Sequence, residues 1–262
     1  MLKKLLKYEL LNSFKILSIF YGLALFFGFL TRIFLSFKNS MFLYVIGQIC
    51  LGTTISMIVN ILINNLMRMW GRFRQSFYGD ESYLTHTLPV KKDTLYLSKF
   101  LIGVITIFVS VLVIILTVFI AFYSKENIAV IKGLLIPNAD YKSNIIGVIL
   151  IAFFVFFLEL INVLQCGYMG IILGHRKNNK KIGFSVLYSF IILLISQLIV
   201  VALICLVDLL SFDLINILTT NEMVELKIVI LVLSLSSLFY LAVIGLGYYL
   251  SNKFFKKGVN VD

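Results

Sequence analysis

The sequence contains few charged residues and almost no proline. Of its 262 residues, 13% are charged and 2 are proline, and the mean hydropathy is +1.04. Soluble domains carry about 25% charged residues, so the apolar surface of this chain exceeds what one soluble core can bury. The composition therefore excludes a soluble enzyme fold.

Cysteine is also scarce, and its spacing carries no motif. The three residues lie inside apolar stretches and form no C-x-x-C pair: Cys50, Cys166 and Cys205. This spacing indicates neither a disulfide framework nor a thiolate metal site. We expect the three side chains to serve as small packing residues.

Motifs for nucleotide and metal chemistry are missing as well. No G-x-x-x-x-G-K-[ST] phosphate loop occurs, the two histidines (His86 and His175) belong to no H-E-x-x-H motif, and the apolar runs contain no paired carboxylates. We therefore expect no catalytic residue, metal site or cofactor in this chain. If the function needs energy from a nucleotide, another chain must supply it.

Hydrophobic residues make up 61% of the chain and are concentrated in six runs. Each run has the roughly 20 residues that a membrane-crossing helix needs. The segment 191–207 is apolar on every face, unlike the alternating strands of a membrane barrel. We predict an all-α membrane protein, a single domain over 1–262 with spans at about 16–36, 41–66, 99–123, 144–174, 182–210 and 227–250.

Lysine and arginine are distributed unevenly between the connections. Of 23 basic residues, 17 lie in the amino-terminal segment, the second-to-third and fourth-to-fifth connections, and the carboxyl-terminal tail. Because basic loops resist translocation, we predict that these segments and both termini are cytoplasmic. The same topology explains the net charge of +11, so we expect no nucleic-acid partner.

The amino-terminal segment 1–15 has the pattern of an interfacial helix. Four of its leucines fall on one helical face, with lysines around the opposite side: Leu2, Leu5, Leu6 and Leu10. Glu9 lies on the apolar face, which favours either a partner at that point or a carboxylate near the lipid headgroups.

The connection 67–98 is too long for a simple turn. It is expected to contain a short helix, with Asp80 as its N-cap and Glu81 in its first turn, ending before Pro89. Asp93 is expected to cap the start of the third span.

Polar residues form stripes within two of the spans. At 100° per residue, four residues of the second span fall within about 80° of one another: Thr53, Ser56, Asn60 and Asn64. On the fourth span, Glu159 and Asn162 share a face. Such residues either line a pathway or hold helices together, including helices of a dimer.

The segment from Phe77 to Lys99, FYGDESYLTHTLPVKKDTLYLSK, resembles a segment of bacterial type-2 ABC exporter permeases. In that family an acidic residue, the pattern Y-L-T-x-T-L-P-V and a lysine recur between the second and third spans. The matching residues are Glu81, Tyr83, Leu84, Thr85, Thr87, Leu88, Pro89, Val90 and Lys99. The motif covers about 23 of 262 residues, and the six spans, the termini and the amino-terminal helix agree with the family.

This resemblance implies a subunit of the bacterial cytoplasmic membrane that pairs with a second permease, a copy or a related chain. Two separate ATPase subunits would bind ATP and Mg²⁺. In similar proteins the helix of this connection docks in a cleft of the ATPase, and the segment 1–15 would supply a second contact. The implied docking residues are Asp80, Glu81, Tyr83, Leu84, Thr85, His86, Thr87 and Leu88.

The leading hypothesis is therefore the permease subunit of an ATP-driven exporter. Its nearly uncharged spans favour an amphipathic or hydrophobic substrate, such as an antimicrobial or toxin-like peptide or a lipid-like molecule. The alternative is a secondary transporter or ion channel with Glu159 as a proton or cation relay. A third reading is an assembly or immunity protein that binds its ligand in the membrane.

Overall fold

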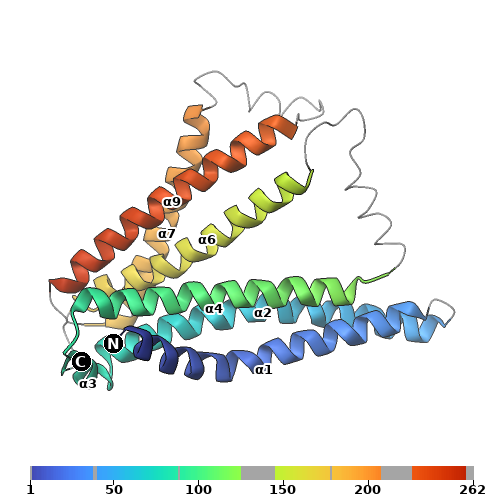
Figure 1. Cartoon of the computed structure of the whole chain (residues 1–262), viewed down its shortest axis with the longest axis horizontal. Coiled ribbons are helices and arrows are strands. Elements are labelled where there is room, and N and C mark those ends of the chain that lie inside the picture. The colour runs from blue at the N-terminus through green and yellow to red at the C-terminus, as the bar shows by residue number, and fades with distance from the viewer. Residues whose placement is uncertain are drawn as a thin grey trace. The chain divides into compact units, whose positions relative to one another are not determined.

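The computed structural model describes residues 2–37, 40–87, 89–124, 145–177, 179–207 and 226–257. Within these ranges every regular element is a helix (Figure 1). The helices are α1 (Leu2–Ser36), α2 (Met41–Tyr78), α3 (Ser82–Thr87), α4 (Lys92–Ala121), α6 (Ile145–Gly174), α7 (Lys181–Val207) and α9 (Leu226–Lys256).

All of these helices except α3 are long and apolar enough to cross a membrane, which makes six candidate spans. The predicted all-α architecture, with six helices long and apolar enough to be spans, is confirmed for the described residues. Both prolines, Pro89 and Pro137, lie outside these helices, so no ring interrupts a backbone hydrogen-bond ladder within them.

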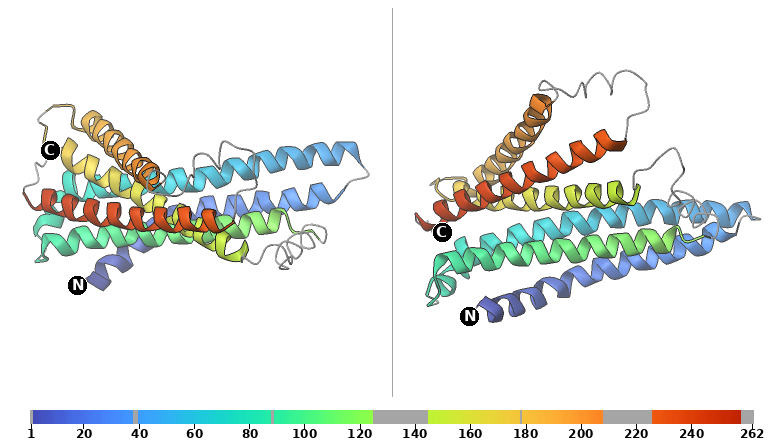
Figure 2. Two further views of the ribbon diagram at one scale, coloured as in Figure 1. Left: turned by 90° about the horizontal axis from the view of Figure 1, so that it is seen from above. Right: turned by 45° about the horizontal axis from the view of Figure 1, so that its top comes forward.

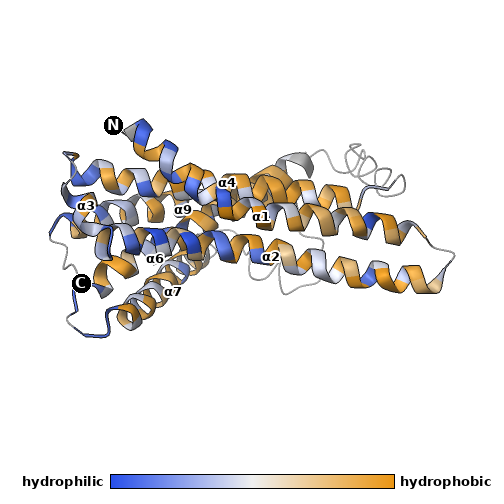
Figure 3. Ribbon diagram, turned by 90° about the horizontal axis from the view of Figure 1, so that it is seen from below, coloured by the Kyte–Doolittle hydropathy of each residue, from blue (hydrophilic) through white to orange (hydrophobic). Residues whose placement is uncertain are grey.

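Four helices extend beyond the predicted spans, and one of them is α9, which ends at Lys256 instead of about 250. α1 is continuous from Leu2, so the expected interfacial segment forms the first turns of the first span. α2 runs to Tyr78 and α4 begins at Lys92, so most of the connection 67–98 is helical. The physical reason is that buried side chains such as Phe73 and Tyr96 continue along both helices. Figure 3 shows hydrophilic residues at the amino-terminal end of α1 and around α3.

The chain folds as two compact units, each with its own core. Unit 1 contains α1, α4 and α2 as far as Phe73. Its core is built around Leu17, Tyr21 and Ala24 of α1 and Ile61 of α2, with apolar side chains of α4 packed against them.

Unit 2 contains the end of α2 from Arg74, α3, and the helices α6, α7 and α9 (Figure 2). α6 packs closely against α7 at Gly170 and Gly174, where an added Cβ would lie 2.5 Å from the Ser189 nitrogen and from the Ser185 Cα. These two glycines therefore allow the backbones of α6 and α7 to approach each other.

Candidate functional site

The turn between α2 and α3 is short and tight. The Gly79 N–H donates to the Arg74 carbonyl at 3.1 Å, and the Ser82 N–H donates to the Gly79 carbonyl at 2.9 Å. These two bonds close α2 and start α3 within three residues. The predicted short helix is therefore present, as α3.

The capping residues differ from those predicted. The first helical bond of α3 runs from the Thr85 N–H to the Glu81 carbonyl at 3.0 Å, so Glu81 precedes the helix and Asp80 lies exposed in the turn. Asp93 does not cap α4 either, because the N-cap is Lys91. The Asp93 carboxylate lies in the first turn of α4, where its negative charge interacts favourably with the helix dipole.

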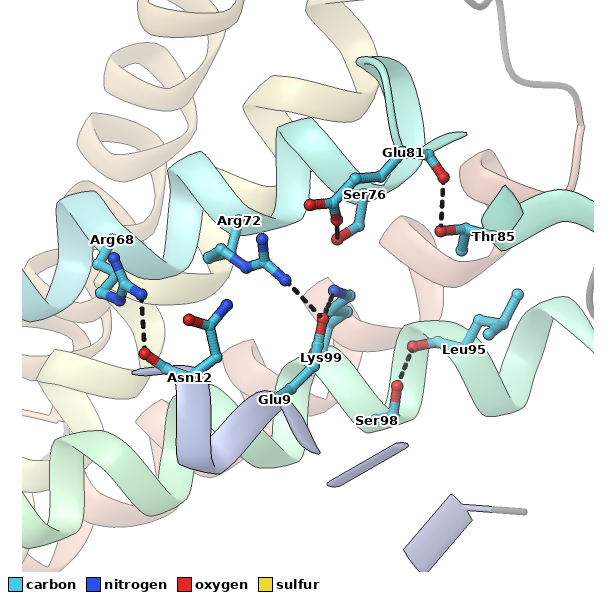
Figure 4. A network of polar contacts seen from close by, with 10 residues as sticks. All are labelled: Glu9, Asn12, Arg68, Arg72, Ser76, Glu81, Thr85, Leu95, Ser98 and Lys99. Atoms are coloured by element: carbon cyan, nitrogen blue, oxygen red, sulfur yellow. Dashed lines mark hydrogen bonds and ion pairs between the residues drawn. The ribbon is translucent and has the colours of Figure 1, made fainter. Parts of the chain in front are cut away.

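One side of α3 is fixed to the end of α2. The Ser76 hydroxyl donates to the Glu81 carboxylate at 3.2 Å (Figure 4), and His86 Nε2 donates to the Phe77 carbonyl at 3.2 Å. Thr85 Oγ1 donates to the Glu81 carbonyl at 3.0 Å. Glu81, Thr85 and His86 therefore position the helix.

The other side of α3 carries two large exposed side chains. Tyr83 is 69% exposed and Leu84 is 76% exposed. Thr87 is also exposed, and its hydroxyl donates to the Leu84 carbonyl at 3.0 Å. The predicted docking residues therefore form two groups. Glu81, Thr85 and His86 position α3, and the exposed residues are Asp80, Tyr83, Leu84 and Thr87. Leu88 lies outside the described residues.

The base of α3 rests on an aromatic cluster within unit 2. The Phe77 ring packs edge-on against Phe255 of α9 with centroids 4.7 Å apart, and Tyr78 stacks on His175 at 4.3 Å. His175 is 1% exposed, and its Nδ1 donates to the Ile171 carbonyl at 2.9 Å. Sequence reasoning missed His175 and Phe255, because nothing in their local sequence indicates a partner about 100 residues or more away.

The amino-terminal part of α1 is held by charged residues of unit 1. The Glu9 carboxylate pairs with the Lys99 ammonium and lies 3.8 Å from Arg72 Nη2, and Arg68 donates to the Asn12 carbonyl at 2.8 Å (Figure 4). Glu9 therefore has partners within this chain, on α2 and α4. Lys99 is largely buried, so the pair compensates a charge that would be costly alone.

The polar stripe of the second span bonds mainly to its own helix. The Asn60 amide donates to the Ser56 carbonyl at 3.0 Å, the Asn64 amide to the Asn60 carbonyl at 2.9 Å, and Thr53 Oγ1 to the Cys50 carbonyl at 2.7 Å. None of these four side chains is buried. Their role as a pathway lining or dimer interface stays a prediction.

The polar core of unit 1 involves neighbouring residues instead. The Asn65 amide donates to Ser110 Oγ at 2.7 Å, and Tyr21 Oη lies 2.8 Å from the same oxygen. Thr31 and Thr54 hydroxyls are 2.9 Å apart. These residues tie α1, α2 and α4 together. They were not predicted from the sequence, because Thr54 and Asn65 each follow a residue of the predicted stripe by one position.

The polar residues of the fourth span contact α7 within unit 2. The Asn162 amide donates to Ser196 Oγ at 3.0 Å, and Glu159 Oε1 accepts from Gln197 Nε2 at 3.5 Å. Asn162 is buried, whereas Glu159 is partly exposed. Asn162 therefore packs helices within one chain, and Glu159 remains accessible.

No family model, curated protein or solved structure matches this chain. Among the described residues, no group of three or more His, Cys, Asp or Glu side chains is placed to hold a metal ion.

Proposed function

We propose that this chain is the transmembrane permease subunit of an ATP-driven ABC exporter. ATP would be hydrolysed by separate subunits that dock on α3. The observation that carries the proposal is the exposure of Tyr83 and Leu84 on a short helix whose opposite side is fixed by hydrogen bonds.

The energetics of α3 support a docking role. Burying a large apolar side chain contributes about 1.5–3 kcal/mol, so a partner that covers Tyr83 and Leu84 gains several kcal/mol from two residues. A six-residue helix is too short to be stable by itself. The bonds from Ser76, Phe77 and Glu81 therefore account for the ordered presentation of these side chains.

The packing of α3 supports the transmission of a movement. α3 belongs to unit 2, and its base contacts Phe255 at the end of α9 through Phe77. Tyr78, one residue later, stacks on His175 at the end of α6. Because packed aromatic side chains resist compression, a displacement of α3 by closing ATPase subunits would be passed to the ends of α6 and α9.

The amino-terminal turns of α1 would supply the second contact with the ATPase. Tyr8 and Leu11 are exposed there, at 70% and 60%, and Glu9 is engaged with Lys99. We propose that this segment is cytoplasmic, as is α3, and that the chain pairs with a second permease in the bacterial cytoplasmic membrane. The many exposed apolar side chains of the spans favour an amphipathic or hydrophobic substrate.

Co-purification tests the docking surface directly. We expect the tagged chain, solubilised from its native membrane, to retain a protein that hydrolyses ATP and contains a phosphate-loop sequence by mass spectrometry. Tyr83→Asp combined with Leu84→Asp should abolish this association while the chain remains inserted.

The matched control is Gln75→Asp, which adds a negative charge at an exposed position near the end of α2. It should leave the ATPase bound. Equal recovery of the ATPase with the double variant and with the control would refute docking on α3. Proton-coupled uptake without any associated ATPase would favour the secondary transporter instead.

A further inference from the structure

Three polar side chains of unit 2 form a hydrogen-bonded series across α9, α7 and α6. The Tyr240 hydroxyl donates to Gln197 Oε1 at 3.3 Å, and Gln197 Nε2 donates to Glu159 Oε1 at 3.5 Å. Each donor points toward the carboxylate, so the series ends on Glu159 as the acceptor. The last contact is longer than the 2.7–3.2 Å of ordinary N–H···O bonds, so the carboxylate accepts only a weak hydrogen bond from Gln197.

Glu159 lies at the middle of its helix. It is 14 residues from Ile145 and 15 residues from Gly174, the two ends of α6, which places it about 21 Å from each end at 1.5 Å per residue. The hydrocarbon core is about 30 Å thick, so a span centred in the bilayer would hold this carboxylate near the midplane. Lipid headgroups lie too far away to neutralise it.

No described residue of its own unit supplies a countercharge to the carboxylate. Among the described residues of unit 2, no lysine or arginine forms an ion pair with Glu159, and α6 itself contains no basic residue. The basic residues of α9 in its last turn are Lys253 and Lys256, far from its centre. An uncompensated carboxylate in hydrocarbon is costly and marks a functional position.

The surroundings favour an organic cation over an inorganic one. Leu158, Val200 and Tyr240 form a buried cluster next to this series, with Val155 and Ile244 packed against it. Hard inorganic cations take about six or more oxygen ligands, and no metal-binding group of side chains occurs among the described residues. One carboxylate beside apolar side chains suits an ammonium or guanidinium group on an apolar body.

Apolar side chains lie one helical turn away from the polar series and are accessible. Phe156 precedes Glu159 by three residues and is 44% exposed, and Val201 follows Gln197 by four residues and is 55% exposed. Residues at these spacings share a helical face. An amphipathic molecule that places its cation on Glu159 can therefore rest its apolar part on the same faces.

We propose that Glu159, positioned by Gln197 and Tyr240, is the binding site for the positively charged group of an amphipathic substrate. The inference rests on the proposed exporter function and names its substrate class, a cationic amphiphile. Glu159 contacts the ligand, and Gln197 and Tyr240 are positioning residues. The ion pair forms in a low-dielectric environment, where the attraction between opposite charges is strong.

Binding of two probes that share the same hydrocarbon chain and differ in the sign of their charge tests this site. The purified complex is titrated with a fluorescent dodecylammonium probe and with the corresponding dodecylsulfonate. We expect Glu159→Gln to weaken binding of the ammonium probe at least tenfold and to leave binding of the sulfonate unchanged. The control Ser234→Ala, on α9, should bind both probes as the unchanged chain does.

A second measurement requires no substitution. Dicyclohexylcarbodiimide modifies carboxyl groups in apolar surroundings, and mass spectrometry locates the adduct. We expect the ammonium probe to protect Glu159 and the sulfonate probe not to. Equal protection by both probes, or displacement of the ammonium probe by K⁺ or Na⁺ alone, would overturn the inference.

The two proposals fail independently. Glu159→Gln should retain the ATPase in co-purification, since Glu159 lies far along α6 from the residues that contact the end of α2. If the ATPase is retained and the ammonium probe binds both forms equally, the cation site is wrong and the exporter assignment stands. If no ATPase is recovered but the probe distinguishes the forms, the exporter assignment is wrong.

Discussion

Replacement of Gly170 by alanine should loosen the contact between α6 and α7. The new Cβ would lie 2.5 Å from the Ser189 nitrogen and 2.7 Å from the Ser185 carbonyl oxygen. The first distance is about 0.9 Å short of the 3.4 Å at which ordinary contact begins. Because both atoms belong to the main chain, no rotamer change relieves the clash, and the helices must separate locally.

The steric cost of the added Cβ can be separated from the change in helix propensity by comparison with a second glycine. Alanine is favoured over glycine in a helix interior by about 1 kcal/mol, and this gain applies equally at Gly245 of α9, where an added Cβ meets no atom within 4 Å. Overpacking costs about 1–3 kcal/mol. Gly170→Ala should therefore be less stable than Gly245→Ala by about 1–3 kcal/mol.

Equilibrium unfolding in mixed detergent micelles, followed by tyrosine fluorescence or circular dichroism, measures this difference. Ser189→Ala should not rescue Gly170→Ala, because it removes the hydroxyl and leaves the main-chain nitrogen in place. Equal stability of the two glycine variants, or full rescue by Ser189→Ala, would refute the close approach of the two backbones.

Three further predictions follow from unit 1 and from α3. Glu9→Gln should destabilise the chain by about 1–3 kcal/mol in the same unfolding assay, because the Lys99 ammonium loses its partner. Adding Lys99→Met to Glu9→Gln should restore part of the lost stability. Additive effects of the two changes would contradict the pairing. Ser110→Ala should cost more than Asn65→Leu, because the serine hydroxyl serves both Tyr21 and Asn65 and its loss leaves both groups unpaired; the reverse order would disprove this. Tyr83→Cys, in a chain with its other cysteines replaced, should react with an impermeant thiol reagent only after cells are permeabilised; labelling of intact cells would place α3 outside.

The position of a short helix was predictable, but its exact start was not. Pro89 and the polar composition of 67–98 indicate a break between two spans, and α3 lies within it. Asp80 and Glu81 are both acceptable at a helix start. The turn that closes on Gly79 selects Glu81, and turn geometry depends on how α2 ends.

Glu9 illustrates a role that local sequence leaves open. Its place on the apolar face of α1 identified it as unusual, and it favoured two different interpretations. The carboxylate meets Lys99 of α4 and Arg72 of α2, so its partners lie 60 residues or more further along the chain. The contacts of His175 and Phe255 were not predicted, because their partners in α2 are even more distant in sequence.

The sequence alone determined the number and type of the candidate membrane-spanning helices, whereas the starts of α1 and α4 and the end of α2 lie well outside the predicted bounds. A helix satisfies its own backbone hydrogen bonds, and a run of about 20 apolar residues suffices to bury it in lipid, so both properties are local. Only the tertiary structure decided which polar side chains within those helices face a neighbour. Asn64 bonds to its own helix and Asn65 to Ser110 of α4; one residue is a rotation of 100°, and the packing partner alone selects between them.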